Sequence, residues 1–226
     1  LAAHGGAIPF TATFLVFADY MRPPMRLAAI SRLKVIFVFT HDSIAVGEDG
    51  PTHEPVEQLL SLRAIPDLVT IRPADANETA GAWQVAMERD APSVLVFSRQ
   101  DLPILDRAGA VGSVADGAYI LSGAGSNPDI VLIGTGSEVD VAVQAAAILA
   151  TQGVSARVVS MPSWEIFERK DAAYRESVLG PVGTARVAVE AGVTLGWERW
   201  VGERGAIVGI DTYGASGPGG AVLKHF

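Results

Sequence analysis

The sequence predicts an α/β protein of two three-layer units, each built on a mainly parallel sheet and joined by a linker. Apolar β-branched and aromatic runs alternate with amphipathic segments, first over residues 34–98 and again over 129–211. A stretch rich in Gly, Ala, Ser and Pro separates the two series at 101–128. The 226 residues are 49% hydrophobic, which supplies ample material for packed cores. We place the domains at 1–115 and 116–226.

The first unit begins with a segment at 11–33 that reads as a helix, interrupted or kinked at Pro23 and Pro24. Continuous β-branched and aromatic runs predict its buried strands: 34–40, 67–72 and 93–98. Two helices are predicted between these strands. Pro55 suits the first turn of one, and Asp75 followed by Glu78 resembles a capping box for the other. Strands that alternate with helices predict a parallel sheet.

The second unit repeats this alternation. Within the linker, residues 118–121 read as a short strand, and residue 129 then opens a strand, a glycine turn and a helix that ends at Gly153. The remaining predicted elements are strands at 154–161, 184–192 and 205–211 and a short helix at 194–202.

Composition limits the kinds of partner. The net charge of −8 argues against nucleic acid, and no apolar run approaches the roughly 18–20 residues of a membrane span. The absence of cysteine excludes disulfides and thiolate metal sites, and the histidine spacing matches no metal-ligand pattern. No signal peptide is visible. Because the chain starts at Leu1 rather than Met and stops abruptly at Phe226, we expect a piece of a longer protein.

Polar side chains follow two of the predicted strands. His41 comes directly after the first strand and Arg99 after the third, so neighbouring strands would place both at the ligand-binding edge of the sheet. Glycines 47 and 50 allow turns that return Asp49 and His53 to the same edge. His and Arg suit a phosphorylated ligand. The alternative is that His41 and His53 merely complete a turn and a helix start.

Two further features have a structural and a functional interpretation. The turn "GTGSE" at 134–138 resembles a phosphate-binding turn but lacks the third glycine of the dinucleotide motif, which favours a plain tight turn. Phe14, Phe17 and Tyr20 recur at helical spacing, and such a stripe is more often core than a platform for a planar ligand.

The segment "HDSIAVGEDGPTHEPVEQLLSLRAIPDLVTIRPADANETAGAW" resembles the signature region of the transketolase family. The resemblance continues through "SRQDLP", "IGTGSEVDVAV", "RVVSMPSWEIFERKDAAYRESVL" and "ARVAVEAG", and so covers essentially the whole chain. Related thiamine diphosphate enzymes, such as deoxyxylulose phosphate synthases, share a shorter "DGPTH"-like core. The leading "THDS" favours transketolases.

This resemblance implies an enzyme that uses thiamine diphosphate and Mg²⁺ or Ca²⁺ to move a two-carbon ketol unit between sugar phosphates. It implies a cytoplasmic homodimer of the pentose phosphate pathway. The chain resembles the latter part of the pyrimidine-binding domain and most of the carboxy-terminal domain. The family's essential glutamate and metal ligands match nothing here, so we expect this piece alone to be inactive. The alternative is a non-catalytic or split subunit that completes a site in another chain.

The resemblance also implies roles for individual residues. His53 would be catalytic and would bind the donor ketose near its C1 hydroxyl, and Asp49 would bind a substrate hydroxyl. His41 and Arg99 would hold the sugar phosphate. Three aromatic side chains would pack against the aminopyrimidine ring of the cofactor: Phe17, with Phe14 and Tyr20 nearby.

Overall fold

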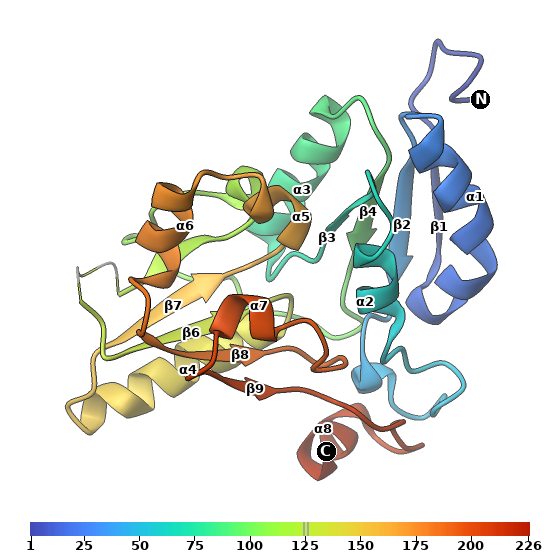
Figure 1. Cartoon of the computed structure of the whole chain (residues 1–226). Coiled ribbons are helices and arrows are strands. Elements are labelled where there is room, and N and C mark those ends of the chain that lie inside the picture. Colours follow the sequence, from blue (N-terminus) through green and yellow to red (C-terminus); the bar gives the residue numbers. More distant parts are fainter. Residues whose placement is uncertain (124, 126) are drawn as a thin grey trace.

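A computed structural model describes residues 1–123, 125 and 127–226, and it contains two separate sheets flanked by helices (Figure 1). The first sheet is parallel, in the order β1-β2-β4-β3: β1 Phe10–Phe14, β2 Ile36–Thr40, β3 Val69–Ile71 and β4 Ser93–Val96. The second sheet has the order β5-β7-β6-β8-β9 and is parallel except for β5, which pairs antiparallel with β7. The predicted α/β class is therefore confirmed. We call these sheets, with their helices, the first and second units.

Helices α1 Ala18–Ile30, α2 Gln58–Arg63 and α3 Ala76–Glu88 cover the two faces of the first sheet. Two short 3-10 helices follow β1 and β2: η1 Leu15–Phe17 and η2 Ile44–Val46. Alternate residues of β2 face opposite ways, as strand geometry requires. Phe37 and Phe39 pack under α1 and α2, whereas Ile36 and Val38 pack under α3. The predicted cap of α3 is present, because Asp75 accepts a 2.9 Å hydrogen bond from the Glu78 amide.

The prediction of helix from residue 11 is wrong at its start. Residues Phe10–Phe14 form β1, which pairs with β2 from Phe10↔Ile36 to Phe14↔Thr40. The pairing of this β-branched and aromatic run with a distant strand overrides local helical spacing. The following α1 continues through both of its prolines. The carbonyls that these prolines leave without an amide partner belong to exposed residues of the first turn, where water can reach them.

The second unit contains the remaining elements. Its strands are β5 Tyr119–Ser122, β6 Ile130–Gly134, β7 Ala156–Ser160, β8 Ala185–Val189 and β9 Ala206–Val208. Its helices are η3 Val114–Asp116, α4 Glu138–Thr151, α5 Trp164–Glu168, α6 Ala172–Leu179, α7 Glu198–Val201 and α8 Gly219–His225. Helix α4 covers one face of the sheet, and α5 to α7 bury an aromatic cluster on the other: Trp164, Phe167, Trp197 and Trp200. No helix among the described residues is both long and apolar enough to cross a membrane.

Parts of the stretch predicted as a linker are packed against the two units. Leu105 and Val114 are buried, and β5 forms an edge of the second sheet close to the predicted 118–121. Residues 124 and 126 lie outside the described part of the chain.

Candidate functional site

The carboxyl ends of β2 and β4 form one open edge of the first sheet. The two strands are parallel neighbours, so His41, directly after β2, and Arg99, just after β4, emerge on the same side. Burial and the positive charge of Arg99 lower the pKa of His41, while Asp49 and Asp42 oppose them. Arg99 and Asp49 thus lie near enough for their charges to act on His41, and the lowered pKa favours a neutral imidazole there.

The His41 imidazole is held from two sides. Its ring stacks on Phe14, with the centroids 3.7 Å apart and the planes 21° from parallel. This contact follows from the sheet register, because Phe14 lies opposite Thr40 at the ends of β1 and β2. The Thr40 hydroxyl and His41 Nδ1 form a 2.9 Å hydrogen bond. The contact to Thr40 occupies Nδ1 and leaves Nε2 as the nitrogen that can meet a ligand.

The loop after η2 turns twice at the predicted glycines, whose φ angles are 87° at Gly47 and 71° at Gly50. The Gly50 amide donates to the Gly47 carbonyl, and the His53 amide donates to the Gly50 carbonyl, both at 2.9 Å. The second unit packs against this loop through α8 and the segment before it (Figure 1). Ser216 donates a 2.6 Å hydrogen bond to the Glu48 carbonyl. The loop that carries Asp49 is therefore supported by both units.

His53 lies at the other end of a row of aromatic rings. Its ring meets Phe17 edge-to-face, with centroids 5.6 Å apart, and Phe17 lies 6.4 Å from Phe14, the partner of His41. Tyr20 lies 6.0 Å from Phe17 and is 81% exposed. These aromatic residues occupy three elements (β1, η1 and α1) rather than one helix, so the predicted helical stripe is wrong although the rings do cluster.

Sequence reasoning missed the two threonines that precede the histidines. Thr52 forms a 2.9 Å hydrogen bond with Nδ1 of His53, repeating the contact between Thr40 and His41. The signal was present as a repeated Thr-His dipeptide. In both cases the hydroxyl fixes one ring nitrogen and leaves Nε2 for other partners.

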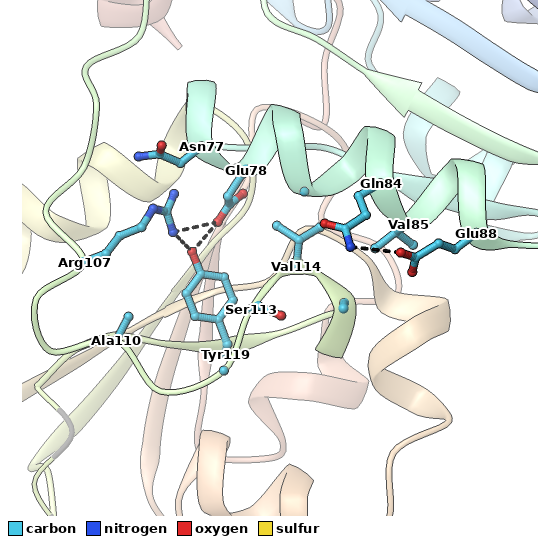
Figure 2. A pocket seen from close by; sticks show the side chains of 13 residues that line it. Asn77, Glu78, Gln84, Val85, Glu88, Arg107, Ala110, Ser113, Val114 and Tyr119 are labelled. Carbon is cyan, nitrogen blue, oxygen red and sulfur yellow. Dashed lines mark hydrogen bonds and ion pairs between the residues drawn. The ribbon is translucent and has the colours of Figure 1, made fainter.

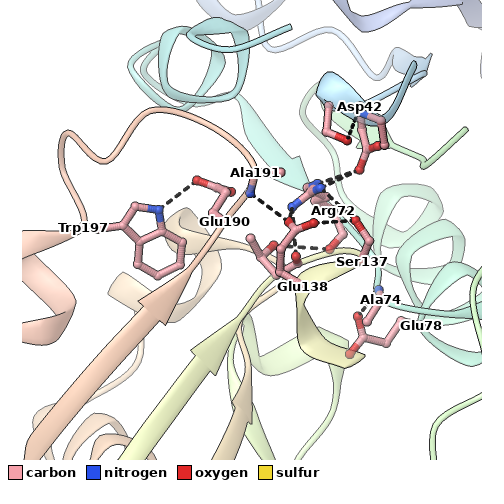
Figure 3. Close-up of polar contacts among 12 residues, drawn as sticks. Asp42, Arg72, Ala74, Glu78, Ser137, Glu138, Glu190, Ala191 and Trp197 are labelled. Atoms are coloured by element: carbon pink, nitrogen blue, oxygen red, sulfur yellow. Dashed lines mark hydrogen bonds and ion pairs between the residues drawn. The ribbon is translucent and has the colours of Figure 1, made fainter. Parts of the chain in front are cut away.

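The "GTGSE" turn holds a side chain of the first unit (Figure 3). Gly136 has a φ of 56°, and a Cβ atom there would lie 2.6 Å from Cζ of Arg72. The Arg72 guanidinium contacts Glu138 and donates to the Thr135 carbonyl at 2.8 Å. Because a protein guanidinium fills this space, the structure agrees with the tight-turn interpretation. Sequence reasoning did not find Arg72.

A cavity of about 330 Å³ lies between α3 and the segment before β5 (Figure 2). Three of the polar side chains that line it interact: Tyr119 donates to Glu78 at 2.7 Å, and Arg107 contacts Tyr119 and also Asp75 outside the lining. None of the predicted site residues lines it. Within the described residues, no group of three or more His, Asp or Glu side chains is placed to hold a metal ion.

Comparisons with known proteins agree with the sequence resemblance. Residues 1–104 match the family model of the transketolase pyrimidine-binding domain, and residues 117–226 match that of the transketolase-like C-terminal domain. A transketolase from Halalkalibacterium halodurans is 55% identical over 229 aligned residues, covering 100% of this chain and 34% of that protein.

Solved structures give the same result. The crystal structure of Campylobacter jejuni transketolase is 41% identical, with a TM-score of 0.93, and the match covers 99% of this chain and 34% of that one. Pichia stipitis transketolase in complex with sedoheptulose 7-phosphate is 38% identical, with a TM-score of 0.87, over 96% of this chain and 31% of that one. The chain therefore belongs to the transketolase family and spans about a third of the length of the relatives it matches.

Proposed function

We propose that this chain forms the pyrimidine-binding and carboxy-terminal parts of a transketolase that transfers a two-carbon ketol unit from a ketose phosphate to an aldose phosphate. The observation that carries this proposal is the convergence of His41, Asp49 and Arg99 at one sheet edge, joined to His53 by a row of aromatic rings. We propose the domain division at 1–115 and 116–226. The gap between the two family matches supports this division.

In this proposal Arg99 and His41 bind the sugar phosphate. Arg99 is exposed, and its planar guanidinium suits phosphate oxygens. The lowered pKa of His41 makes it a neutral hydrogen-bond partner until a phosphate dianion arrives and favours protonation. Arg99 therefore supplies the positive charge, and His41 supplies a directional hydrogen bond to the phosphate through Nε2.

His53 and Asp49 bind the reacting end of the sugar. With Nδ1 fixed by Thr52 and one edge against Phe17, the His53 imidazole can exchange a proton with a substrate hydroxyl through Nε2. Asp49 is exposed on the glycine turn and can accept a hydrogen bond from a second hydroxyl. His53 is the catalytic residue of the proposal.

The aromatic residues fit a flat heteroaromatic ring. Phe14 and Phe17 lie within 19° of parallel and are only half-buried, and Tyr20 extends the surface. We assign these three residues to the aminopyrimidine of thiamine diphosphate, which when bound supplies the carbanion chemistry of ketol transfer. We also propose that the complete protein is a cytoplasmic homodimer of the pentose phosphate pathway, with Mg²⁺ or Ca²⁺ held by residues outside this chain.

We call the complete transketolase that would contain this chain the full-length parent. The test compares the full-length parent with the 226-residue chain, each with thiamine diphosphate, Mg²⁺, a ketose phosphate and an aldose phosphate. We expect ketol transfer by the parent and none by the chain alone. A parent without transferase activity would contradict the proposal, and turnover by the pure chain would contradict the need for further residues. In a third arm the missing amino-terminal part is added as a separate polypeptide. Restored activity there would show that this chain can complete the site in trans.

A further inference from the structure

We propose that the second unit positions the phosphate-binding end of the site through a buried chain of ion pairs from Glu138 through Arg72 to Asp42. Within this series of ion pairs, Arg72 and Glu138 are positioning residues for His41. The proposal rests on the proposed function, because it takes His41 and Arg99 as ligands of the sugar phosphate. It gives a role to the "GTGSE" turn, which the site itself does not use.

Arg72 follows β3 directly and is fully buried where the two units meet (Figure 3). Its Nε donates to Oδ2 of Asp42 at 2.8 Å, and a terminal nitrogen lies 2.7 Å from the same oxygen. On the other side it contacts Glu138 and donates to the Thr135 carbonyl at 2.8 Å and to the Ser137 hydroxyl at 3.3 Å. A single guanidinium therefore joins the loop after β2 to the start of α4.

The second unit also fixes the backbone of Arg72. The Arg72 amide donates to the Pro162 carbonyl at 2.9 Å, and the Arg72 carbonyl accepts from the Gly136 amide at 3.2 Å. Burial alone would lower the pKa of Arg72, but the carboxylates of Asp42 and Glu138 raise it above its ordinary value. The guanidinium thus stays charged and has little freedom to move.

Asp42 transmits this constraint to His41, its neighbour in the chain. His41 has a φ of 61°, and a residue other than glycine keeps this left-handed conformation only where its surroundings hold it. Asp42 is 1% exposed, and its Oδ1 has no hydrogen-bond partner among the described residues. The contact with Arg72 is therefore the side-chain anchor of Asp42. Phe14 and Thr40 then set the plane of the His41 ring.

A second buried ion pair between the units provides a matched control. Arg63 at the end of α2 donates to both oxygens of Glu190, at 2.7 and 2.8 Å, and both side chains are at most 4% exposed. Trp197 donates to Glu190 at 2.8 Å. Neither Arg63 nor Glu190 contacts His41 or Asp42 among the described hydrogen bonds and ion pairs. Among the described residues, this pair joins the units without a hydrogen bond to Arg72, Asp42 or His41, and only the charge of Glu190 acts on Arg72.

The test uses the full-length parent with Glu138→Gln and, as the control, Glu190→Gln. The KM and kcat are measured with an aldose phosphate and with the corresponding phosphate-free aldose. We expect Glu138→Gln to raise the KM for the phosphorylated acceptor about tenfold, since small displacements of a binding group have effects of this order or larger. The KM for the phosphate-free acceptor should not change. Glu190→Gln should lower the melting temperature and leave both KM values unchanged.

An unchanged KM for the phosphorylated acceptor in Glu138→Gln would overturn the proposal, as would an equal rise in Glu190→Gln. If Glu138→Gln does not fold, Ser137→Ala replaces it, because the Ser137 hydroxyl touches Arg72 and donates to Glu138 at 2.6 Å. That variant should show a smaller rise for the phosphorylated acceptor only, and no rise would overturn the proposal. A wild-type parent that shows no preference for the phosphorylated acceptor would instead contradict the proposed function.

Discussion

Each sheet has a carboxyl edge at which neighbouring parallel strands end, and the two edges differ in what they hold. In the first sheet, β2 and β4 end in an open edge lined by His41, Asp49 and Arg99. In the second, β6 ends in the turn at 134–138, and the Arg72 side chain of the first unit fills the space beside it (Figure 3). Parallel α/β sheets commonly bind ligands at this edge.

The difference shows that the location alone does not make a site. At the first edge hydrogen-bonding capacity is left over: Arg99 makes no hydrogen bond or ion pair with the described residues, and Nδ1 of His41 is occupied while Nε2 is not. At the second edge Arg72 is bound by two carboxylates, a carbonyl and a hydroxyl. A side chain whose donors are all used holds two units together, whereas one with unused donors can bind a substrate.

Removing the proposed catalytic group, the His53 imidazole, should have the largest effect. We expect His53→Ala in the full-length parent to lower the rate of ketol transfer by about 10²- to 10⁴-fold, the usual contribution of a general acid or base. The affinity for thiamine diphosphate should remain, because Phe14 and Phe17 are unchanged. The control is His225→Ala, an exposed histidine on α8. Wild-type turnover in His53→Ala would remove His53 from the proposed mechanism.

Removing the Arg72 guanidinium from the edge of the second sheet should mainly destabilise the fold. Arg72→Met leaves the carboxylates of Asp42 and Glu138 buried without their counter-charge, so we expect the free energy of unfolding to fall by about 3–5 kcal/mol. Chemical denaturation of the 226-residue chain measures this change. In the control, Arg199→Met breaks a pair with Glu168 in which both side chains are 48% exposed, and about 1 kcal/mol or less should be lost. Equal losses in the two variants would contradict the role given to burial.

Sequence reasoning recovered the open edge better than the filled one, for a physical reason. His41 and Arg99 follow apolar runs that could be recognised locally, and the capping by Asp75 lies within four residues. Arg72 also ends an apolar run, but its partner Glu138 lies 66 residues away in the chain. No local pattern distinguishes an arginine that binds a ligand from one that binds a distant carboxylate. The misassigned β1 has the same origin, because pairing with β2 decides its conformation.

Removing the positive charge of Arg99 at the open edge should weaken the binding of phosphorylated substrates. We expect Arg99→Ala to raise the KM for sugar phosphates by about 10- to 100-fold, since hydrogen bonds to charged groups contribute about 1.5–3 kcal/mol. Phosphate-free sugars should keep their KM, and steady-state kinetics of the full-length parent with both kinds of substrate measure the difference. Arg26→Ala, an exposed arginine of α1, is the control. A parallel rise for phosphate-free sugars would show that Arg99 does not act through the phosphate.

The smallest effect concerns Glu54, a carboxylate directly after His53. Glu54 is 3% exposed, and among the described residues neither of its oxygens accepts a well-formed hydrogen bond. Gly214 of the second unit packs so closely that a Cβ there would lie 2.0 Å from Glu54 Oε2. Burial raises the pKa of Glu54 above its ordinary value of 4.5, and the Gly47 amide opposes part of this rise. In contrast with Glu138, this buried carboxylate has no countercharge within the described part of the chain.

A raised folded-state pKa makes stability fall with pH. The contribution of Glu54 is fully present below its unfolded pKa and is lost as the pH rises through the folded value. Glu54→Gln keeps the shape but cannot ionise, so we expect a gain of about 1 kcal/mol in unfolding free energy at alkaline pH and little change at acid pH. Denaturation of the 226-residue chain at about pH 4 and about pH 8 measures this, with exposed Glu176→Gln as the control. An equal effect at both pH values, or a loss of stability at alkaline pH, would contradict this prediction. Either result would show that the Glu54 carboxylate has a counter-charge in solution, as Glu138 does.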